Sequence, residues 1–480
     1  MLKKSNIISI IIFLIISFEN ININEYSLYK SFKKKYFKNE FYIKENNKCN
    51  KLDPIYVMSQ RLKKYPINIC QNEDSRHICF QSSKYDFYNK LYRFPYGLIC
   101  VMKNFVLDPS KSLKTNLTYK GPIDKNFRGA PILLNGFFNI NCEKKFSKNN
   151  FSKLYINYFN SWNYSDNEDN IDLEEFAPEK TVFFISRNED SPNLFHGFSE
   201  IINSLAVIYL LDLKPEEIQI IFLESIFLNN EPLYDLYTNL ISRGNKPIYI
   251  RDLNKKYHIS SAIHIPIGAD SPLFMMVNTH NCKYSTVTYS LVNKLINKYL
   301  NLTKYNESFK SDNDTFYYPK AIIKRKHLNI KFVTKVTIQW RKIWPKGRIN
   351  QKRLLGNGPE LSEKLSNILP SNFLIKLVDT ASLPITQQIS LVKDTDYFIG
   401  VHGAGLSLSI FMPNNAILHE ILPYKKNKLL SLMSKLSGHK TYSDVIRNKI
   451  KIIEQNEYIF FDENAFVNCV IKHMKQNNLI

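Results

Sequence analysis

The sequence predicts an α/β protein with two Rossmann-like domains that face each other across a cleft, preceded by a disulfide-tied N-terminal region. Three observations support this prediction. Strand-like and helix-like segments alternate in two series, one beginning at Lys180 and the other at about residue 330. A polar segment from Asn301 to Pro319 separates the two series. Five of the seven cysteines lie in the first third of the chain, which is typical of a region held by disulfides.

The N-terminus has the layout of a signal peptide. Lys3 and Lys4 precede a mostly apolar run from Ile7 to Phe18, and polar residues follow at once. This run is shorter than the roughly 20 residues that span a bilayer, so we expect residues 1–19 to be a signal peptide. A short uncleaved signal anchor is the alternative, and it is the one membrane contact that we expect. Residues 20–48, rich in Lys, Asn and Tyr, are typical of a stem or flexible tail.

The segment 49–175 is expected to be a loop-rich region tied by disulfides. Its cysteine pairing stays open, and the odd total leaves at least one thiol free or bonded to another chain. No CxxC or His/Cys pair has zinc spacing, so we expect no structural zinc. A location in the lumen of the endoplasmic reticulum or Golgi, or secretion, fits six N-glycosylation triplets, which start at Asn116, Asn150, Asn163, Asn301, Asn306 and Asn313.

The formal net charge of +22 raises the question of a nucleic-acid partner. The basic residues are spread along the whole chain and form no single stripe with interleaved aromatic residues. We therefore interpret them as a solvated basic surface and expect no nucleic-acid partner.

The first α/β series defines a domain at 176–325. We expect strands at 181–185, 218–223 and 247–250, with helices at 193–213 and 233–242. The second series defines a domain at 326–480. Its expected strands are 335–340, 374–378, 396–401 and 417–422, and its expected helices are 351–369, 384–392, one after Gly405, and 464–475.

The strongest local signal is a strand that runs into a glycine-rich turn and then opens a helix. The turn is His402-Gly403-Ala404-Gly405, and Leu406 follows it. Small residues at such a turn let the backbone approach a ligand closely, and the amides of the following helix favour a phosphate. Ligands of open α/β sheets bind at this carboxyl end of the strands. The alternative is a tight turn that only packs the helix on the sheet.

The residues around this turn resemble the signature of glycosyltransferase family 61. The resemblance covers Gln387 to Leu406 and then Phe411, Pro413, Glu420 and Pro423. Arg341 with Arg348-Ile349-Asn350 is similar to the paired-arginine segment of the family. Asn193 to Glu200 is similar to its Asn-x-x-His-x-x-x-Asp helix, with Glu200 where the family usually has Asp. Within the family, the resemblance is closest to the EGF-domain-specific O-linked N-acetylglucosamine transferases. Those enzymes end in an endoplasmic-reticulum retention tetrapeptide, and this sequence ends Asn477-Asn-Leu-Ile480.

The resemblance implies a GT-B fold and an inverting transfer from a UDP-sugar, with 326–480 as the nucleotide-sugar domain and 176–325 as the acceptor domain. Arg341 and Arg348 would hold the diphosphate, with surface arginines as the alternative. The turn residues, with His402 as a donor, would line the nucleotide site. Glu420 would accept hydrogen bonds from ribose hydroxyls, unless it is an ordinary exposed glutamate.

The catalytic base is expected on the helix that carries His196 and Glu200. Their i, i+4 spacing places both on one helical face, so Glu200 could orient His196 or act itself. The alternative for His196 is a hydrogen-bonded structural residue at a helix start.

No metal or other cofactor is demanded. Two Asp-x-Asp triplets occur, and neither is well placed for a metal-bound diphosphate. We interpret both as structural or solvated; they are formed by Asp312 with Asp314 and by Asp394 with Asp396.

The predicted function is transfer of a sugar, most simply N-acetylglucosamine, from a UDP-sugar to a Ser or Thr hydroxyl of a secreted, EGF-like protein domain. One alternative is transfer of xylose or N-acetylglucosamine to a glycan. The alternative from another class is a secreted carbohydrate-binding protein with a degenerate transferase site.

Overall fold

The computed structural model of the chain describes residues 66–80, 99–112, 133–143, 156–165, 173–186, 194–223, 233–265, 293, 295–300, 302, 315–342, 353–422, 429–453 and 456–480. The expected signal peptide and stem lie outside these residues, as do Cys49, Cys282 and Arg348. Within the described ranges, no helix combines the length and the apolarity that crossing a membrane requires.

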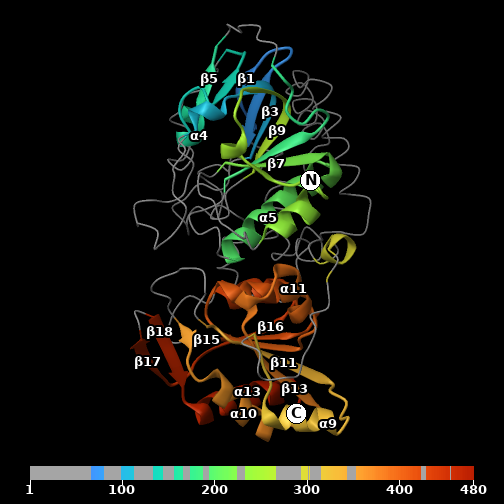
Figure 1. Ribbon diagram of the computed structural model, residues 1–480, viewed down its shortest axis with the longest axis vertical. Coiled ribbons are helices and arrows are strands. Elements are labelled where there is room, and N and C mark those ends of the chain that lie inside the picture. Colours follow the sequence, from blue (N-terminus) through green and yellow to red (C-terminus); the bar gives the residue numbers. More distant parts are fainter. Residues whose placement is uncertain are drawn as a thin grey trace, which may run out of the picture.

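The first lobe is built on one nine-stranded sheet that joins the cysteine-containing region to the first α/β series (Figure 1). Its main path runs β1-β2-β3-β9-β6-β7-β8, while β4 pairs with β3 and β5. The β1, β2, β3 and β9 neighbours are antiparallel, and β9, β6, β7 and β8 are parallel. The strands are β1 (Pro66–Gln71), β2 (Arg76–Phe80), β3 (Ile99–Leu107), β4 (Phe138–Ile140), β5 (Trp162–Tyr164), β6 (Thr181–Ile185), β7 (Ile218–Phe222), β8 (Ile248–Tyr249) and β9 (Tyr257–Ile265).

Two disulfides hold the N-terminal strands, so the expected disulfide-tied region is confirmed. Cys79 and Cys100 lie directly opposite each other on β2 and β3 and are bonded. Cys70 at the end of β1 is bonded to Cys142, which follows β4. These bonds close loops of 21 and 72 residues and so reduce the conformational freedom of the unfolded chain.

Helix α5 (Leu194–Leu210) is apolar almost all round because it packs on both of its sides. One side covers the first sheet, and the other reaches the second lobe, where the rings of Phe198 and Phe411 meet at 5.1 Å. The helix expected at 233–242 is present as a short α6 (Tyr234–Leu236) that continues into the π-helix η7 (Tyr237–Ile241). The lobe also contains α4 (Ile156–Asn160) and the 3₁₀ helices η3 (Pro109–Lys111), η6 (Pro215–Glu217) and η8 (Ile250–Asp252).

The second lobe contains a six-stranded sheet of order β10-β13-β11-β14-β15-β16. All neighbours are parallel except β10 and β13. From β11 the chain first moves outward to β13 and then returns across β11 to β14, so the strand order reverses between β11 and β14. The strands are β10 (Phe316–Tyr317), β11 (Thr334–Gln339), β13 (Phe373–Val378), β14 (Tyr397–Val401), β15 (Ile417–Leu422) and β16 (Lys440–Val445).

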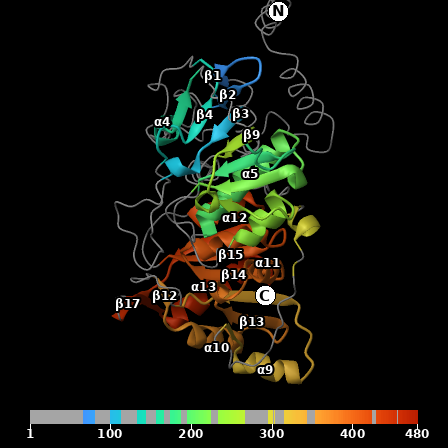
Figure 2. The ribbon, with the colours of Figure 1, turned by 45° about the horizontal axis from the view of Figure 1, so that its top comes forward.

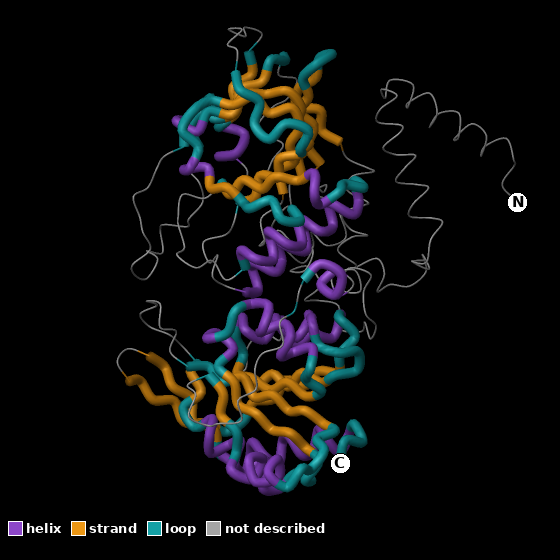
Figure 3. The backbone as a smooth tube through the Cα atoms, turned by 45° about the vertical axis from the view of Figure 1, so that its right-hand side comes forward, coloured by secondary structure: helices purple, strands orange, loops and turns teal. Residues whose placement is uncertain are grey.

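Helices cover both faces of the second sheet (Figures 2 and 3). On the face toward α5 lie α11 (Ile385–Lys393), the 3₁₀ helix η12 (Ala404–Phe411) and α12 (Leu429–Leu436). On the opposite face lie α9 (Lys320–His327), α10 (Gly358–Ile368) and α13 (Glu463–Gln476). The short 3₁₀ helix η11 (Thr380–Ser382) follows β13. A third, small sheet of order β12-β18-β17 is formed by β12 (Leu354–Leu355), β17 (Asn448–Ile453) and β18 (Asn456–Phe461).

Two expected elements differ in detail. The helix expected at 351–369 begins only at Gly358, because residues 354–355 form β12 against β18. Gly356 permits this pairing, since a Cβ there would lie 2.5 Å from the Phe460 ring. The second sheet begins at Phe316, upstream of the expected domain start at residue 326. The strand-and-helix order of the remaining described elements confirms a mixed α/β fold.

Candidate functional site

The arginine and the glycine turn singled out from the sequence meet where the strand order of the second sheet reverses. Arg341 follows β11, and the turn follows β14, its parallel neighbour. The Nη1 atom of Arg341 donates a hydrogen bond to the carbonyl oxygen of His402 at 3.2 Å. A Cβ on Gly403 would lie 1.7 Å from this nitrogen, so only glycine lets the guanidinium rest on the turn. Ligands of doubly wound sheets bind at such a crevice.

Gln339, the last residue of β11, packs its side chain against the glycine turn. A Cβ on Gly405 would lie 2.1 Å from its Nε2 atom, and one on Gly400 would lie 3.1 Å from its Oε1 atom. The Nε2 atom donates to Thr380 Oγ1 at 2.8 Å. Our sequence reasoning missed Gln339, although its place two residues before Arg341 on the same strand end was a usable signal.

His402 and Glu420 form a contact across β14 and β15. The Nδ1 atom of His402 is hydrogen-bonded to Glu420 Oε1, and the His402 amide donates to the Ile421 carbonyl oxygen at 2.9 Å. The His402 side chain keeps 17% exposure, whereas that of Glu420 keeps 0%. Glu420 Oε2 accepts from the amide and hydroxyl of Ser431, at 3.2 and 2.5 Å, and from Ser443 Oγ at 3.3 Å.

This burial changes the interpretation of Glu420. The sequence suggested a carboxylate beyond the strand that accepts from ribose hydroxyls. The structure instead places Glu420 inside β15, where its carboxylate contacts His402. A carboxylate on Nδ1 fixes the imidazole orientation and directs Nε2 away from it. His402 is therefore the member of the pair that a ligand can reach.

The remaining turn residues serve the packing of η12. The Leu406 amide donates to the Gly403 carbonyl oxygen at 3.0 Å, and the Leu406 side chain is fully buried against Gly400. Ala404 begins η12, and its carbonyl oxygen accepts from Ser407 Oγ at 2.5 Å. Small residues thus place the start of η12 beside Arg341.

His196 and Glu200 lie on the first two turns of α5, the helix that packs against η12. His196 is half-buried, and burial lowers its pKa, so the imidazole is neutral near pH 7. Glu200 is 1% exposed, and its Oε2 atom accepts from the Tyr237 hydroxyl at 3.1 Å. The chain thus brings a neutral imidazole, and a buried carboxylate one turn along, to the lobe opposite the glycine turn.

The structure places some of the other residues singled out from the sequence. Asp394 and Asp396 both bind Lys335, Asp394 through the Lys335 ammonium and Asp396 through the Lys335 amide at 2.8 Å. Their partners agree with a structural role. Asn163 lies on β5, and its side-chain Nδ2 atom donates to Asn139 Oδ1 at 3.3 Å. Outside the described residues lie Arg348, Asp312, Asp314 and the asparagines of the other five glycosylation triplets.

Comparison with known proteins finds one family and one relative. Residues 194–418 match the family model of Glycosyltransferase 61. A 64-residue segment is 33% identical to the EGF domain-specific O-linked N-acetylglucosamine transferase of Drosophila melanogaster. That match covers 13% of this chain and 12% of the relative's length. The matched residues 194–418 include Arg341 and the glycine turn, so this part of the chain is similar to the glycosyltransferases of family 61.

Proposed function

We propose that this protein is an inverting transferase that moves N-acetylglucosamine from UDP-N-acetylglucosamine to a Ser or Thr hydroxyl of an EGF-like domain in the lumen of the secretory pathway. The observation that carries the proposal is the Arg341 guanidinium resting on Gly403 at the point where the strand order reverses. The name of the Drosophila melanogaster relative supports the choice of sugar and acceptor.

The donor site is proposed at this crevice, with the UDP diphosphate beside the turn. A guanidinium carries five N–H donors in a planar fork, enough to brace the turn and to hold phosphate oxygens. The small residues Gly403, Ala404 and Gly405 let the diphosphate approach the backbone amides at the start of η12. Arg341 would then neutralise the charge that develops on UDP as it leaves.

The acceptor is proposed to enter from the α5 side, in a GT-B-like arrangement of the two lobes. His196 takes the proton of the acceptor hydroxyl as its oxygen attacks the anomeric carbon of the sugar. The bond between that carbon and the β-phosphate oxygen breaks, and UDP leaves on the opposite face, which inverts the anomeric configuration. Glu200 is too buried to touch the acceptor, so we assign it the positioning of α5 through Tyr237.

UDP release and sugar transfer by the purified protein test this function. We expect transfer from UDP-N-acetylglucosamine to a folded EGF repeat, and a loss of roughly 10- to 150-fold in Arg341→Ala, from the 1.5–3 kcal/mol that a charge-assisted hydrogen bond contributes. Arg243→Ala, which removes an exposed ion pair with Glu216, is the matched control and should keep full activity. Transfer from UDP-xylose, or to a glycan only, would overturn the choice of substrate. Failure to bind or turn over any UDP-sugar would favour a carbohydrate-binding protein with a degenerate site.

A further inference from the structure

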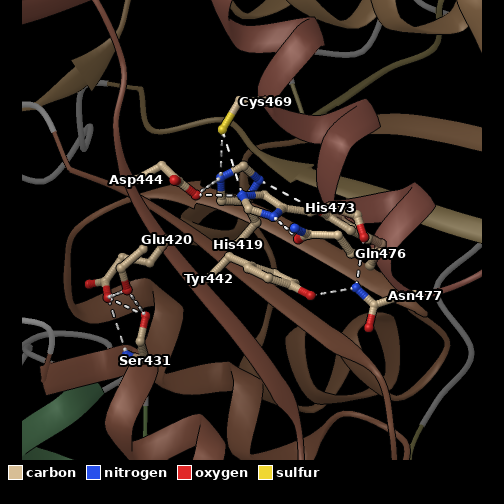
Figure 4. Close-up of polar contacts among 11 residues, drawn as sticks. His419, Glu420, Ser431, Tyr442, Asp444, Cys469, His473, Gln476 and Asn477 are labelled. Carbon is tan, nitrogen blue, oxygen red and sulfur yellow. Dashed lines mark hydrogen bonds and ion pairs between the residues drawn. The ribbon is translucent and has the colours of Figure 1, made fainter.

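Four metal-ligating side chains converge on the face of the second sheet that α13 covers, away from the glycine turn (Figure 4). They are His419 on β15, Asp444 on β16, and Cys469 and His473 on α13. One ligand atom from each lies within 4.8 Å of all the others. The Nε2 atoms of His419 and His473 lie 3.1 and 2.7 Å from the same Asp444 oxygen, Oδ2.

The backbone produces this convergence in two ways. His419 pairs with Tyr442, so Asp444, two residues further along β16, lies on the same face of the sheet. Cys469 and His473 are four residues apart on α13, so both point from one face of the helix toward the sheet. Three elements therefore deliver four ligand atoms to one point.

The spacing is that of a tetrahedral metal site. Cys469 Sγ lies 3.8 Å from His419 Nε2 and 3.7 Å from His473 Nε2. Tetrahedral zinc, with Zn–N of about 2.0–2.1 Å and Zn–S of about 2.3 Å, separates N and S by about 3.5 Å. The sulfur-to-nitrogen distances are thus close to those of a zinc site. The distances from Asp444 Oδ2 to the two Nε2 atoms would lengthen slightly when a cation replaces the hydrogen bonds.

The Nδ1 atoms of the two histidines, which face away from the cluster, also have polar contacts. The Tyr397 hydroxyl contacts His419 Nδ1 at 3.2 Å, and Gln476 Oε1 contacts His473 Nδ1 at 3.0 Å. Such contacts orient a ligating imidazole and fix which nitrogen faces the metal. In both rings they leave Nε2 for the centre of the cluster.

The cluster is only partly buried. His419 and His473 are buried, whereas Asp444 keeps 33% exposure, which gives an ion a route of entry from solvent.

We propose that His419, Asp444, Cys469 and His473 bind one structural zinc ion that fixes α13 to β15 and β16. Four protein ligands complete a tetrahedral shell, which is the mark of a structural rather than a catalytic zinc. The proposal departs from our expectation of no structural zinc, because the ligands come from three elements and only Cys469 and His473 are close in sequence. The alternative is a hydrogen-bonded network of His419, Asp444 and His473 that binds no metal. That alternative does not explain why the Cys469 thiol lies at nearly the same distance from both Nε2 atoms.

Metal analysis of the purified full chain tests the proposal. We expect about one zinc per chain in the folded wild type, and less than about one fifth of that in Cys469→Ser and His473→Gln. The matched control is His439→Gln, which changes a buried histidine of the same lobe that bonds the Met412 carbonyl oxygen instead. This variant should keep its zinc.

Two further readouts keep the test decisive if a variant fails to fold. Cobalt exchanged into the wild-type protein should show a thiolate-to-cobalt charge-transfer band that Cys469→Ser lacks. Zinc at about 100 times its dissociation constant should raise the melting temperature of the chelator-treated 480-residue chain by roughly 3 °C. Wild-type protein that holds no metal after zinc loading, with no shift in melting temperature, would overturn the proposal. Metal that survives in both ligand variants would overturn it as well.

Discussion

Replacing Glu420 with glutamine tests whether the buried carboxylate sets the proton position on His402. Ser431 donates to Glu420 Oε2 through both its amide and its hydroxyl, so the glutamine carbonyl oxygen should remain at that position. The glutamine NH₂ group then faces His402 Nδ1, where Oε1 had been. Nδ1 must become an acceptor, and the imidazole proton moves to Nε2.

The size of the effect follows from a charge-assisted bond that a neutral amide bond replaces. A hydrogen bond to a charged group contributes about 1.5–3 kcal/mol and a neutral one about 0.5–1.5 kcal/mol, and about 1.36 kcal/mol corresponds to a tenfold change in rate. A difference of about 1–1.5 kcal/mol that acts wholly in the transition state lowers kcat/KM in Glu420→Gln by about 5- to 13-fold. The melting temperature should change little, because glutamine has nearly the same shape and keeps the Ser431 bonds.

Three measurements together decide the outcome. Steady-state UDP release gives kcat/KM, thermal unfolding reports stability, and ¹⁵N NMR of the labelled imidazole shows which nitrogen carries the proton. Ser443→Ala is the control, because it removes a 3.3 Å contact to Glu420 and leaves the His402 contact in place. A Glu420→Gln protein that melts normally and works at the wild-type rate would refute the assignment.

Three further predictions follow from single contacts. Gly403→Ala would place a methyl group 1.7 Å from Arg341 Nη1 and force the guanidinium to shift, so we expect UDP affinity, measured by calorimetry, to fall, but by less than in Arg341→Ala. Burial lowers the pKa of His77 from 6.5 to about 3. Below pH 6.5, His77 therefore binds a proton in the unfolded chain but not in the folded chain. His77 should therefore contribute about 2 kcal/mol to the stability lost in urea unfolding between pH 7 and pH 5, and His77→Gln should lose that contribution. Tyr237→Phe leaves buried Glu200 without its phenol donor and should cost about 1–3 kcal/mol of stability, whereas unchanged unfolding would contradict the contact's importance.

The sequence predicted well those features that depend on local pattern. Strands β6 and β14 are almost wholly apolar, and β7, β13 and β15 are mostly apolar and fully buried, because parallel strands covered on both faces bury nearly every side chain. The meeting of Arg341 with the glycine turn was also predictable, because the carboxyl ends of parallel neighbours share one edge of the sheet.

Features that depend on long-range pairing were not predictable. The antiparallel strands β1, β2 and β3 join the first sheet through β9, which our reading of the sequence did not identify. Glu420 looked like an exposed residue because nothing in its neighbourhood shows that Ser431 and Ser443 satisfy its carboxylate. The His419 cluster was invisible for the same reason, since its partners lie on elements separated by many residues.

Strand β15 connects the two polar networks of the second lobe. His419 and Glu420 are consecutive, so their side chains leave opposite faces of the sheet, the first toward α13 and the second toward the glycine turn. On the neighbouring strand β16, the consecutive residues Ser443 and Asp444 also point to opposite faces, Asp444 to the face of His419 and Ser443 to that of Glu420. A metal bound at the His419 cluster would therefore stabilise the strands that place Glu420 without contacting any substrate.

This arrangement predicts the order of events when the metal is removed. Chelation should first lower the melting temperature, because α13 loses its link to β15 and β16. The affinity for UDP should weaken only secondarily, as Glu420 and His402 lose their fixed positions. Titration of the protein with a chelator, followed by unfolding and UDP binding at each step, measures both effects. Complete loss of turnover with unchanged stability and UDP affinity would instead place the metal in the chemical step, and would contradict a structural site on the far face of the sheet.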